Sequence, residues 1–266
     1  MKLSKLLLPG LLALSALACN ATFSFGYPTP TAVTPIEATA TSVPVLSTQV
    51  MLVSVPFIET NPGSETFPPY TITAQTPQLT GSDDPRVLAF NQRMGDLVNT
   101  ALEEYRRGFQ ELPVTEFSNS STLEMTYKAV AVMGDLWSFK FDFSFYADGA
   151  AHPGLNSITI NYDLGRGHEL QLGDLFLPGS AYLETISAYC TAELQKQPYA
   201  DAFTLEGAAP TEQNYRNWNL TPDGLMITFD TYQVAPGAAG PQTINVPFAI
   251  LSGLLDPQGP LAGLVP

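Results

Sequence analysis

Hydrophobic residues recur at helical spacing along one long stretch that begins after Asp84 and Pro85. An aspartate followed by proline is typical of a helix start, because the carboxylate accepts a free N–H of the first turn and proline presets φ. Gly108 ends the pattern. We therefore expect one long amphipathic helix that covers a sheet, and its apolar stripe comprises Val87, Phe90, Met94, Leu97, Val98, Ala101, Leu102 and Tyr105.

Apolar and polar residues alternate in the next two segments, 122–132 and 136–145, and again over 157–164. Alternation with a period of two is typical of strands that have one buried and one solvated face. Turns are predicted at Met133-Gly134-Asp135 and Gly165-Arg166-Gly167. The segments predict an antiparallel meander, whose central strand carries Trp137, Phe139, Phe141, Phe143 and Phe145 on one face and Ser138, Lys140, Asp142 and Ser144 on the other.

The C-terminal part of the chain predicts a second helix and further strands. Ser180 is a suitable N-cap for the helix, Pro222-Asp223-Gly224 predicts a turn, and "VPFAILSGLL" predicts a short closing helix. Helices that lie on antiparallel sheets define an α+β fold. The apolar residues behind this prediction are Leu183, Ile186, Cys190 and Leu194 in the helix, Leu225, Ile227 and Phe229 after the turn, and Ile244 and Val246 in a last strand.

The N-terminus has the pattern of an export signal. Lys2 and Lys5 precede an apolar run that ends at Ala18 and is short for a membrane span. Cys19 follows, and two interpretations stay open: a lipobox with Cys19 as the lipid-bearing first residue, or an ordinary cleavage site. We favour the lipobox, which predicts a lipid anchor at the outer surface of the cell membrane. Without lipidation the protein is secreted. With Cys19 lipidated, Cys190 has no disulfide partner and is interpreted as a small buried hydrophobe.

Composition shifts along the chain suggest four parts. Residues 1–19 are the signal, and residues 20–69 are rich in Thr, Pro and Ala, which predicts an extended tether without a core. Met51 to Ile58 within it is apolar enough to dock as a strand. We expect two α+β subdomains after the tether, 70–146 and 147–266, with a soft boundary near Tyr146.

The chain is acidic, with 25 acidic against 11 basic residues and a formal charge of −14. Such a charge repels nucleic acid and attracts cationic partners. Acidity that only keeps an exported protein soluble is the competing explanation.

Candidate catalytic chemistry is sparse. His152 and His168 are the two histidines, and no Gly-x-Ser-x-Gly motif accompanies them. The spacing of His, Cys and carboxylates matches no metal site, so no catalytic residue, metal or cofactor is expected.

The carboxylates and histidines leave two enzymatic alternatives. Asp142, Asp148 and Asp163 would act on a glycan if one cleft held them, but nothing in their spacing brings them together. A hydrolase that uses Asp148 and His152 is the other. The proline after His152 favours instead a turn residue that joins two strands.

Two long segments resemble a bacterial extracytoplasmic domain of unknown function. They are "GAAHPGLNSITINYDLGRGHELQLGDLF" and "DGLMITFDTYQVAPGAAGPQTINVPFAIL", and "YTITAQTPQLTG" with the helix after it is similar to the domain's usual companion. The domain forms the outer part of RsiV-type anti-sigma factors and the N-terminal region of PdaC-type peptidoglycan deacetylases. Ala150 and Gly154 depart from the family's usual Gly and Asn.

The resemblance implies a binding domain, because the RsiV-type outer region recognises lysozyme, a cationic muramidase. Neither the sigma-binding region nor the deacetylase domain has a counterpart in this sequence. We therefore expect a non-catalytic lipoprotein that binds lysozyme or another basic cell-wall protein, with His152, Pro153, Tyr232 and Pro236 as candidate ligand-binding residues. The alternative is a peptidoglycan-binding or glycan-binding module in which Trp137, Trp218 and the tyrosines stack on sugars.

Mass spectrometry of the mature protein tests the N-terminal prediction. We expect a chain that begins at Cys19 and carries the added mass of lipid. An unmodified N-terminus at or after Cys19 would contradict the lipobox and leave the secreted form.

Overall fold

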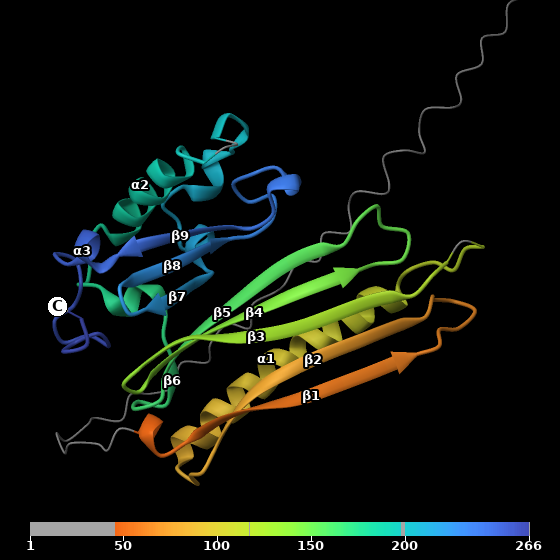
Figure 1. Cartoon of the computed structure of the whole chain (residues 1–266), viewed down its shortest axis with the longest axis horizontal. Coiled ribbons are helices and arrows are strands. Elements are labelled where there is room, and N and C mark those ends of the chain that lie inside the picture. Colours follow the sequence, from red (N-terminus) through yellow and green to blue (C-terminus); the bar gives the residue numbers. More distant parts are fainter. Residues whose placement is uncertain (1–45, 117, 198–199, 266) are drawn as a thin grey trace, which may run out of the picture.

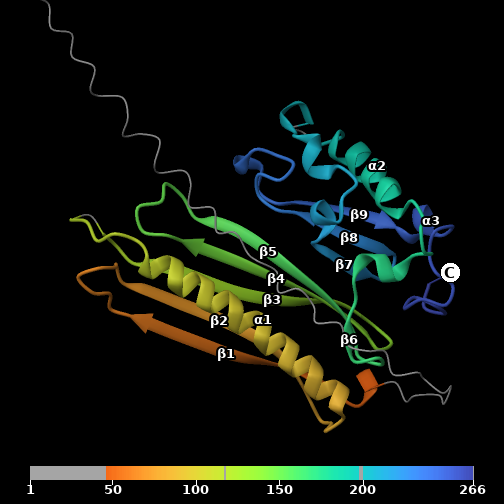
Figure 2. The same cartoon turned by 180° about the vertical axis from the view of Figure 1, so that it is seen from behind.

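The computed structural model describes residues 46–116, 118–197 and 200–265. The predicted signal, Cys19 and residues 20–45 of the predicted tether lie outside the described residues. Within them, a six-stranded sheet of order β1-β2-β3-β4-β5-β6 and a three-stranded sheet of order β7-β8-β9 make up the fold (Figures 1 and 2). With helices on both sheets, this arrangement confirms the α+β prediction.

The first sheet is mostly antiparallel. Only β2 and β3 run parallel, and α1 (Pro85–Gln110) provides the crossover between them. Figure 2 shows α1 lying along one face of the sheet. The strands are β1 (Met51–Asn61), β2 (Tyr70–Thr80), β3 (Ser121–Met133), β4 (Leu136–Tyr146), β5 (Gly154–Asp163) and β6 (His168–Glu169).

The long helix α1 begins where the sequence predicts and runs two residues past Gly108. Asp84 accepts a hydrogen bond from the backbone N–H of Arg86, and Pro85 occupies the first helical position. All eight predicted stripe residues are buried, together with Phe109. Opposite them, the aromatic face of β4 is buried from Trp137 to Phe143, while Phe145 is half-buried. The main core therefore lies between α1 and the sheet.

The fold starts earlier than the predicted tether boundary at residue 69. A short 3₁₀ helix, η1 (Leu46–Thr48), docks on the β3–β4 turn, where the Ser47 backbone N–H donates to Asp135 Oδ1 at 2.8 Å. The predicted strand from Met51 to Ile58 is confirmed as part of β1, which pairs with β2 along its whole length. Backbone pairing with β2 holds this segment, together with packing of Leu46, Leu52 and Phe57 on the main core.

The boundary expected near Tyr146 falls inside the first sheet. β4 and β5 flank it and pair over ten residues, from Leu136↔Asp163 to Phe145↔Gly154. Since a sheet cannot be divided between two hydrogen-bonded strands, residues 154–163 belong with the N-terminal elements.

The second layer is built on the sheet of β7 (Trp218–Thr221), β8 (Gly224–Phe229) and β9 (Gln242–Pro247). Two helices, α2 (Tyr182–Leu194) and α3 (Phe248–Leu251), pack on it and bury a second core (Figure 1). The remaining 3₁₀ turns are η2 (Leu172–Leu175), η3 (Ala200–Ala202), η4 (Leu205–Ala208), η5 (Glu212–Tyr215) and η6 (Gly237–Ala239).

Two sequence predictions for this layer have different outcomes. The predicted N-cap at Ser180 is wrong: Ala181 takes that position, because the Ser180 backbone N–H closes a preceding turn on the Leu177 carbonyl. Cys190 is fully buried, as expected, and burial raises the pKa of its thiol to about 12.

Side chains join the two sheets. β7 is the edge of its own sheet, and its outer backbone groups bond to side chains of β4 and β5 instead of to another strand. The Trp218 carbonyl accepts from Asn161 Nδ2 at 2.8 Å, and the Leu220 N–H donates to Ser138 Oγ and Asn161 Oδ1 at 3.0 Å each. Buried backbone groups need such partners, so this network fixes where the second layer sits on the first.

None of the helices in the described residues combines the length and the apolar character needed to cross a bilayer.

Phe90 tests the main core. Its ring is fully buried, with ring centroids 5.6 Å from Phe139 and 5.2 Å from Tyr162. We expect Phe90→Ala to lower the free energy of unfolding by about 3–5 kcal/mol, measured by urea denaturation. Leu88→Ala on the same helix is the control, because Leu88 is 54% exposed and its loss should cost less than about 0.5 kcal/mol.

Candidate ligand-binding groove

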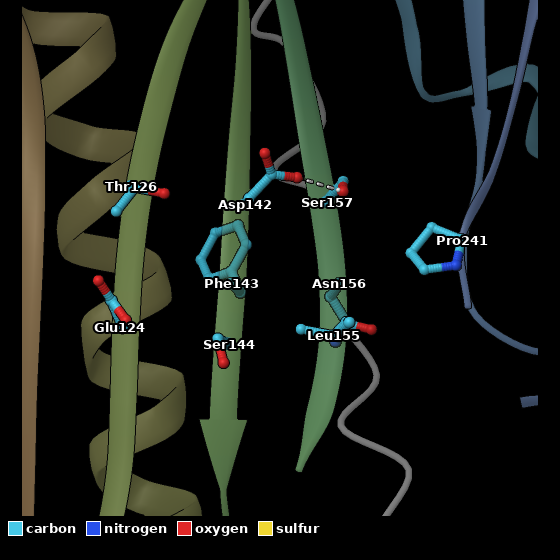
Figure 3. A pocket seen from close by; sticks show the side chains of 9 residues that line it. All are labelled: Glu124, Thr126, Asp142, Phe143, Ser144, Leu155, Asn156, Ser157 and Pro241. Carbon is cyan, nitrogen blue, oxygen red and sulfur yellow. Dashed lines mark hydrogen bonds between the residues drawn. The ribbon is translucent and has the colours of Figure 1, made fainter. Parts of the chain in front are cut away.

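A groove of about 300 Å³ opens on the face of the first sheet that lies away from α1 (Figure 3). Strands β3, β4 and β5 form its floor, and Pro241 at the start of β9 stands over one side. The groove therefore lies where the two layers meet, beside the network that joins them. Its lining residues are Glu124, Thr126, Asp142, Phe143, Ser144, Leu155, Asn156, Ser157 and Pro241.

Strand register places the polar residues of the floor side by side. Thr126 pairs with Asp142 and Asp142 with Ser157, while Glu124 pairs with Ser144 one step along. Because side chains alternate along a strand, these residues share the solvated face and Phe143 points to the helix side, as Figure 3 shows. The alternation predicted for β4 thus supplies the floor of the groove.

The floor combines negative charge with fixed hydrogen bonds. Asp142 Oδ1 accepts from Ser157 Oγ at 2.9 Å and contacts Lys140 Nζ at 2.8 Å. The Asp142 side chain is half exposed, and Glu124 is exposed with no ion pair to it among the described residues. With Asp142 paired to Lys140, Glu124 leaves the described lining with one unpaired negative charge, which favours cationic groups over anionic ones.

The loop between β8 and β9, residues 230–241, borders the groove and carries an exposed tyrosine. Tyr232 is 65% exposed and has a φ of 69°, in the left-handed region that bulky residues rarely adopt. Its ring covers Gly237, where a Cβ atom would lie 2.2 Å from Tyr232 Cζ. A strained residue held by its surroundings is a common feature of ligand sites, so the loop presents a pre-positioned aromatic side chain.

None of the four residues predicted to bind ligand lines the groove. His152 and Pro153 are exposed in the loop between β4 and β5, and His152 Nδ1 lies 3.0 Å from the Pro153 carbonyl oxygen. Tyr232 and Pro236 are exposed in the loop that ends at the lining residue Pro241. Their contact with a ligand stays a prediction.

Sequence reasoning missed the groove itself. Asp142 stood on a predicted polar face, but nothing in the sequence paired it with Ser157 or brought Pro241 over them. The only signal was the polar face of β4, which continues on its neighbours as Thr126 and Glu124 in β3.

The described residues do not bring Asp142, Asp148 and Asp163 into one cleft. Asp148 accepts from the Asn119 N–H beside the β4–β5 loop, whereas Asp163 binds Arg166 at the far end of β5, about 30 Å away at strand spacing. No group of three or more His, Cys, Asp or Glu side chains in the described part of the chain is placed to hold a metal ion.

Trp137 and Trp218, the two candidate sugar platforms, are each only 5% exposed. Their rings belong to the two cores, so they cannot stack on a glycan.

Comparison with known proteins relates part of the chain to a described family. Residues 173–249 match the family model described as "Protein of unknown function (DUF3298)". The matched segment spans α2, the second sheet and the Tyr232 loop. The match confirms the resemblance to an extracytoplasmic domain of unknown function.

Two curated proteins are similar to the chain. Peptidoglycan-N-acetylmuramic acid deacetylase PdaC of Bacillus subtilis is 29% identical over 175 residues, which are 63% of this chain and 37% of that protein. Esterase Rv3036c of Mycobacterium tuberculosis is 29% identical over 104 residues, 39% of this chain and 46% of that protein. The chain thus matches less than half the length of either relative.

Two solved structures of DUF3298-family proteins share the fold. The one from Bacteroides fragilis has a TM-score of 0.62 at 17% identity and covers 80% of this chain and 96% of its own. The one from Pseudomonas aeruginosa has a TM-score of 0.55 at 18% identity and covers 82% of this chain and 97% of its own. The arrangement of both layers therefore recurs at low sequence identity.

The packing of Tyr232 on Gly237 is testable. We expect Gly237→Ala to displace the Tyr232 ring, because the added methyl group would occupy its place. NMR spectra of protein with labelled tyrosine should show a changed environment for this residue. Gly253→Ala is the control, since a Cβ there meets nothing within 4 Å; an unchanged Tyr232 signal in Gly237→Ala would contradict the described packing.

Proposed function

We propose that the protein is a non-catalytic cell-envelope module that binds a cationic cell-wall-associated protein such as lysozyme. Export and a lipid anchor at Cys19 are part of the proposal. The observation that carries it is the acidic groove formed by Glu124 and Asp142 beside the exposed, fixed Tyr232. Charge would guide the partner to the groove, and the tyrosine would provide contact area.

Charge complementarity is the first support. With a net charge of −14, the chain attracts basic proteins at long range, and complementary charge raises association rates. Such attraction weakens as salt rises, because the Debye length is only about 8 Å at physiological ionic strength. A salt-sensitive complex is therefore expected.

The Tyr232 loop is the second support. Tyrosine is enriched among residues that dominate binding energy, because it combines a large apolar area with a polar tip and few rotatable bonds. The left-handed backbone and the contact with Gly237 restrict Tyr232 before binding. Little conformational entropy would remain to be lost on association.

The relatives support the setting of this function. PdaC is named for an activity on peptidoglycan, a cell-envelope polymer, which is consistent with an envelope-associated domain and with export of this chain. In RsiV-type proteins, which the chain resembles over about Tyr70 to Leu255 together with the companion domain, the outer region recognises lysozyme. A binding role is favoured over the esterase activity in the other relative's name, because no hydrogen bond joins a serine to His152 or His168 among the described residues.

A peptidoglycan-binding role is the second candidate. Strand register places one row of residues across the solvated sheet face: Ile58, Thr73, Glu124, Ser144 and Leu155. Its hydroxyl groups suit a polyhydroxyl ligand, and PdaC is named for such a substrate. The burial of Trp137 and Trp218 counts against it, because glycan sites usually stack sugars on exposed aromatic rings.

Titration calorimetry of the chain from residue 20 onward with lysozyme tests the proposal. We expect a complex that weakens with salt. The double variant Glu124→Gln with Asp142→Asn should lower the affinity by about tenfold, which corresponds to about 1.4 kcal/mol. Glu184→Gln combined with Asp223→Asn is the control, because it removes two exposed charges outside the groove.

Two outcomes would overturn the proposal: no complex with lysozyme, or a complex equally weakened by the control pair. Sedimentation of the same proteins with insoluble peptidoglycan separates the second candidate. Sedimentation that is lost in Ser144→Leu while lysozyme fails to bind would favour the glycan role.

A further inference from the structure

One edge of the first sheet next to the groove has no strand partner. Between Gly154 and Asn161, β5 pairs with β4 on one side only, and β6 joins it solely at Tyr162 and Asp163 among the described residues. An edge of this kind leaves backbone N–H and C=O groups without ladder bonds. Something else has to satisfy them where they are buried.

Two side chains of the Tyr232 loop take the place of the missing strand. The carboxylate of Asp230 accepts from the Ser157 N–H at 3.3 Å, and Thr231 Oγ1 donates to the Leu155 carbonyl at 3.3 Å. Ser157 and Leu155 both line the groove. The loop is therefore seated on the edge of the groove floor by these two adjacent residues.

Asp230 is itself held by the second layer. Its Oδ2 atom accepts from Arg216 Nη2 at 2.5 Å and from Asn217 Nδ2 at 3.1 Å. Its side chain is only 15% exposed. Because a buried carboxylate needs a paired charge, Arg216 makes this seat possible.

The same contact continues into the loop and into the groove floor. The Asp230 N–H donates to Gln233 Oε1, and Gln233 Nε2 donates to the carbonyls of Gly207 and Asn214 at 2.9 Å each. On the other side, Ser157 bonds to Asp142 through its hydroxyl group. Tyr232 thus lies between Thr231 and Gln233, which are both held by hydrogen bonds. Its position therefore depends on the contact that Asp230 makes with β5.

We propose that Asp230, paired with Arg216, is the positioning residue that seats the Tyr232 loop on β5 and sets the shape of the ligand-binding groove. That the groove binds a ligand rests on the proposed function; the contact between Asp230 and β5 does not. The seat itself is a property of the free protein and can be measured without any ligand.

The contact between the Tyr232 loop and β5 depends on pH through Asp230. Burial raises the pKa of Asp230, while Arg216, the Ser157 N–H and Lys140 of β4 lower it in part. Asp142 of β4 reaches the same site through Ser157. Because the pKa of Asp230 is raised when the loop is seated on β5, the seated form binds a proton more readily than the open form. A fall in pH therefore favours the seated form.

Hydrogen exchange of the free chain tests the proposal. Arg216→Gln leaves a buried carboxylate unpaired, so we expect protection of the Ser157 amide and of residues 231–241 to fall about tenfold or more at neutral pH. Exchange must be corrected for its intrinsic pH dependence. Adding Asp230→Asn, or lowering the pH until Asp230 is protonated, should restore protection, because each removes the unpaired charge.

Arg166→Gln is the matched control, because Arg166 is 52% exposed and pairs with Asp163 at the far end of β5. It should leave the Ser157 amide unchanged. Unaltered protection in Arg216→Gln, or a loss that neither acid nor Asp230→Asn reverses, would overturn the proposal. If lysozyme does not bind while these exchange results hold, the proposed function fails and the seat stands.

Discussion

The arrangement of the two layers depends on one constraint: the unpaired edges of two sheets meet, and their backbone groups are satisfied by side chains. At β7 the Trp218 carbonyl and the Leu220 N–H bond to Asn161 and Ser138 of the first sheet. A buried backbone group without a partner costs free energy comparable to a lost hydrogen bond. This requirement, more than apolar contact alone, selects a single seating of the second layer, since hydrophobic burial has no direction.

The groove is a consequence of that seating. The polar face of β3–β5 would be an open sheet surface without the second layer, and Pro241 with the Tyr232 loop converts one end of it into a concave site (Figure 3). The strained backbone at Tyr232 is tolerated because Gln233 and Asp230 hold both sides of it. Rigid sheets that carry a functional loop are a common solution for ligand binding, and solved DUF3298-family structures share this fold at 17–18% identity.

Local patterns predicted the elements well and their assembly poorly. The stripe from Val87 to Tyr105 and the aromatic face of β4 follow from periodicity, which depends only on neighbours in the chain. Ser180 shows the limit, because whether it caps a helix depends on the turn before it. The boundary expected near Tyr146 separated two paired strands, because composition carries no information about which strands pair. Asp142 was predicted on a polar strand face and Tyr232 as a candidate ligand-binding residue, but nothing in the sequence placed them near one groove.

The sequence by itself determined the helix, the strands, the acidic charge and the family resemblance, because each rests on residue type and short-range spacing. Only the tertiary structure decided that Asp230 meets the Ser157 N–H, 73 positions earlier in the chain. Contacts at that separation depend on loop closure and on the mutual fit of two layers, which no local pattern encodes. The second layer and the Tyr232 loop are placed over the first sheet because the backbone groups at two sheet edges bond to side chains from distant parts of the chain.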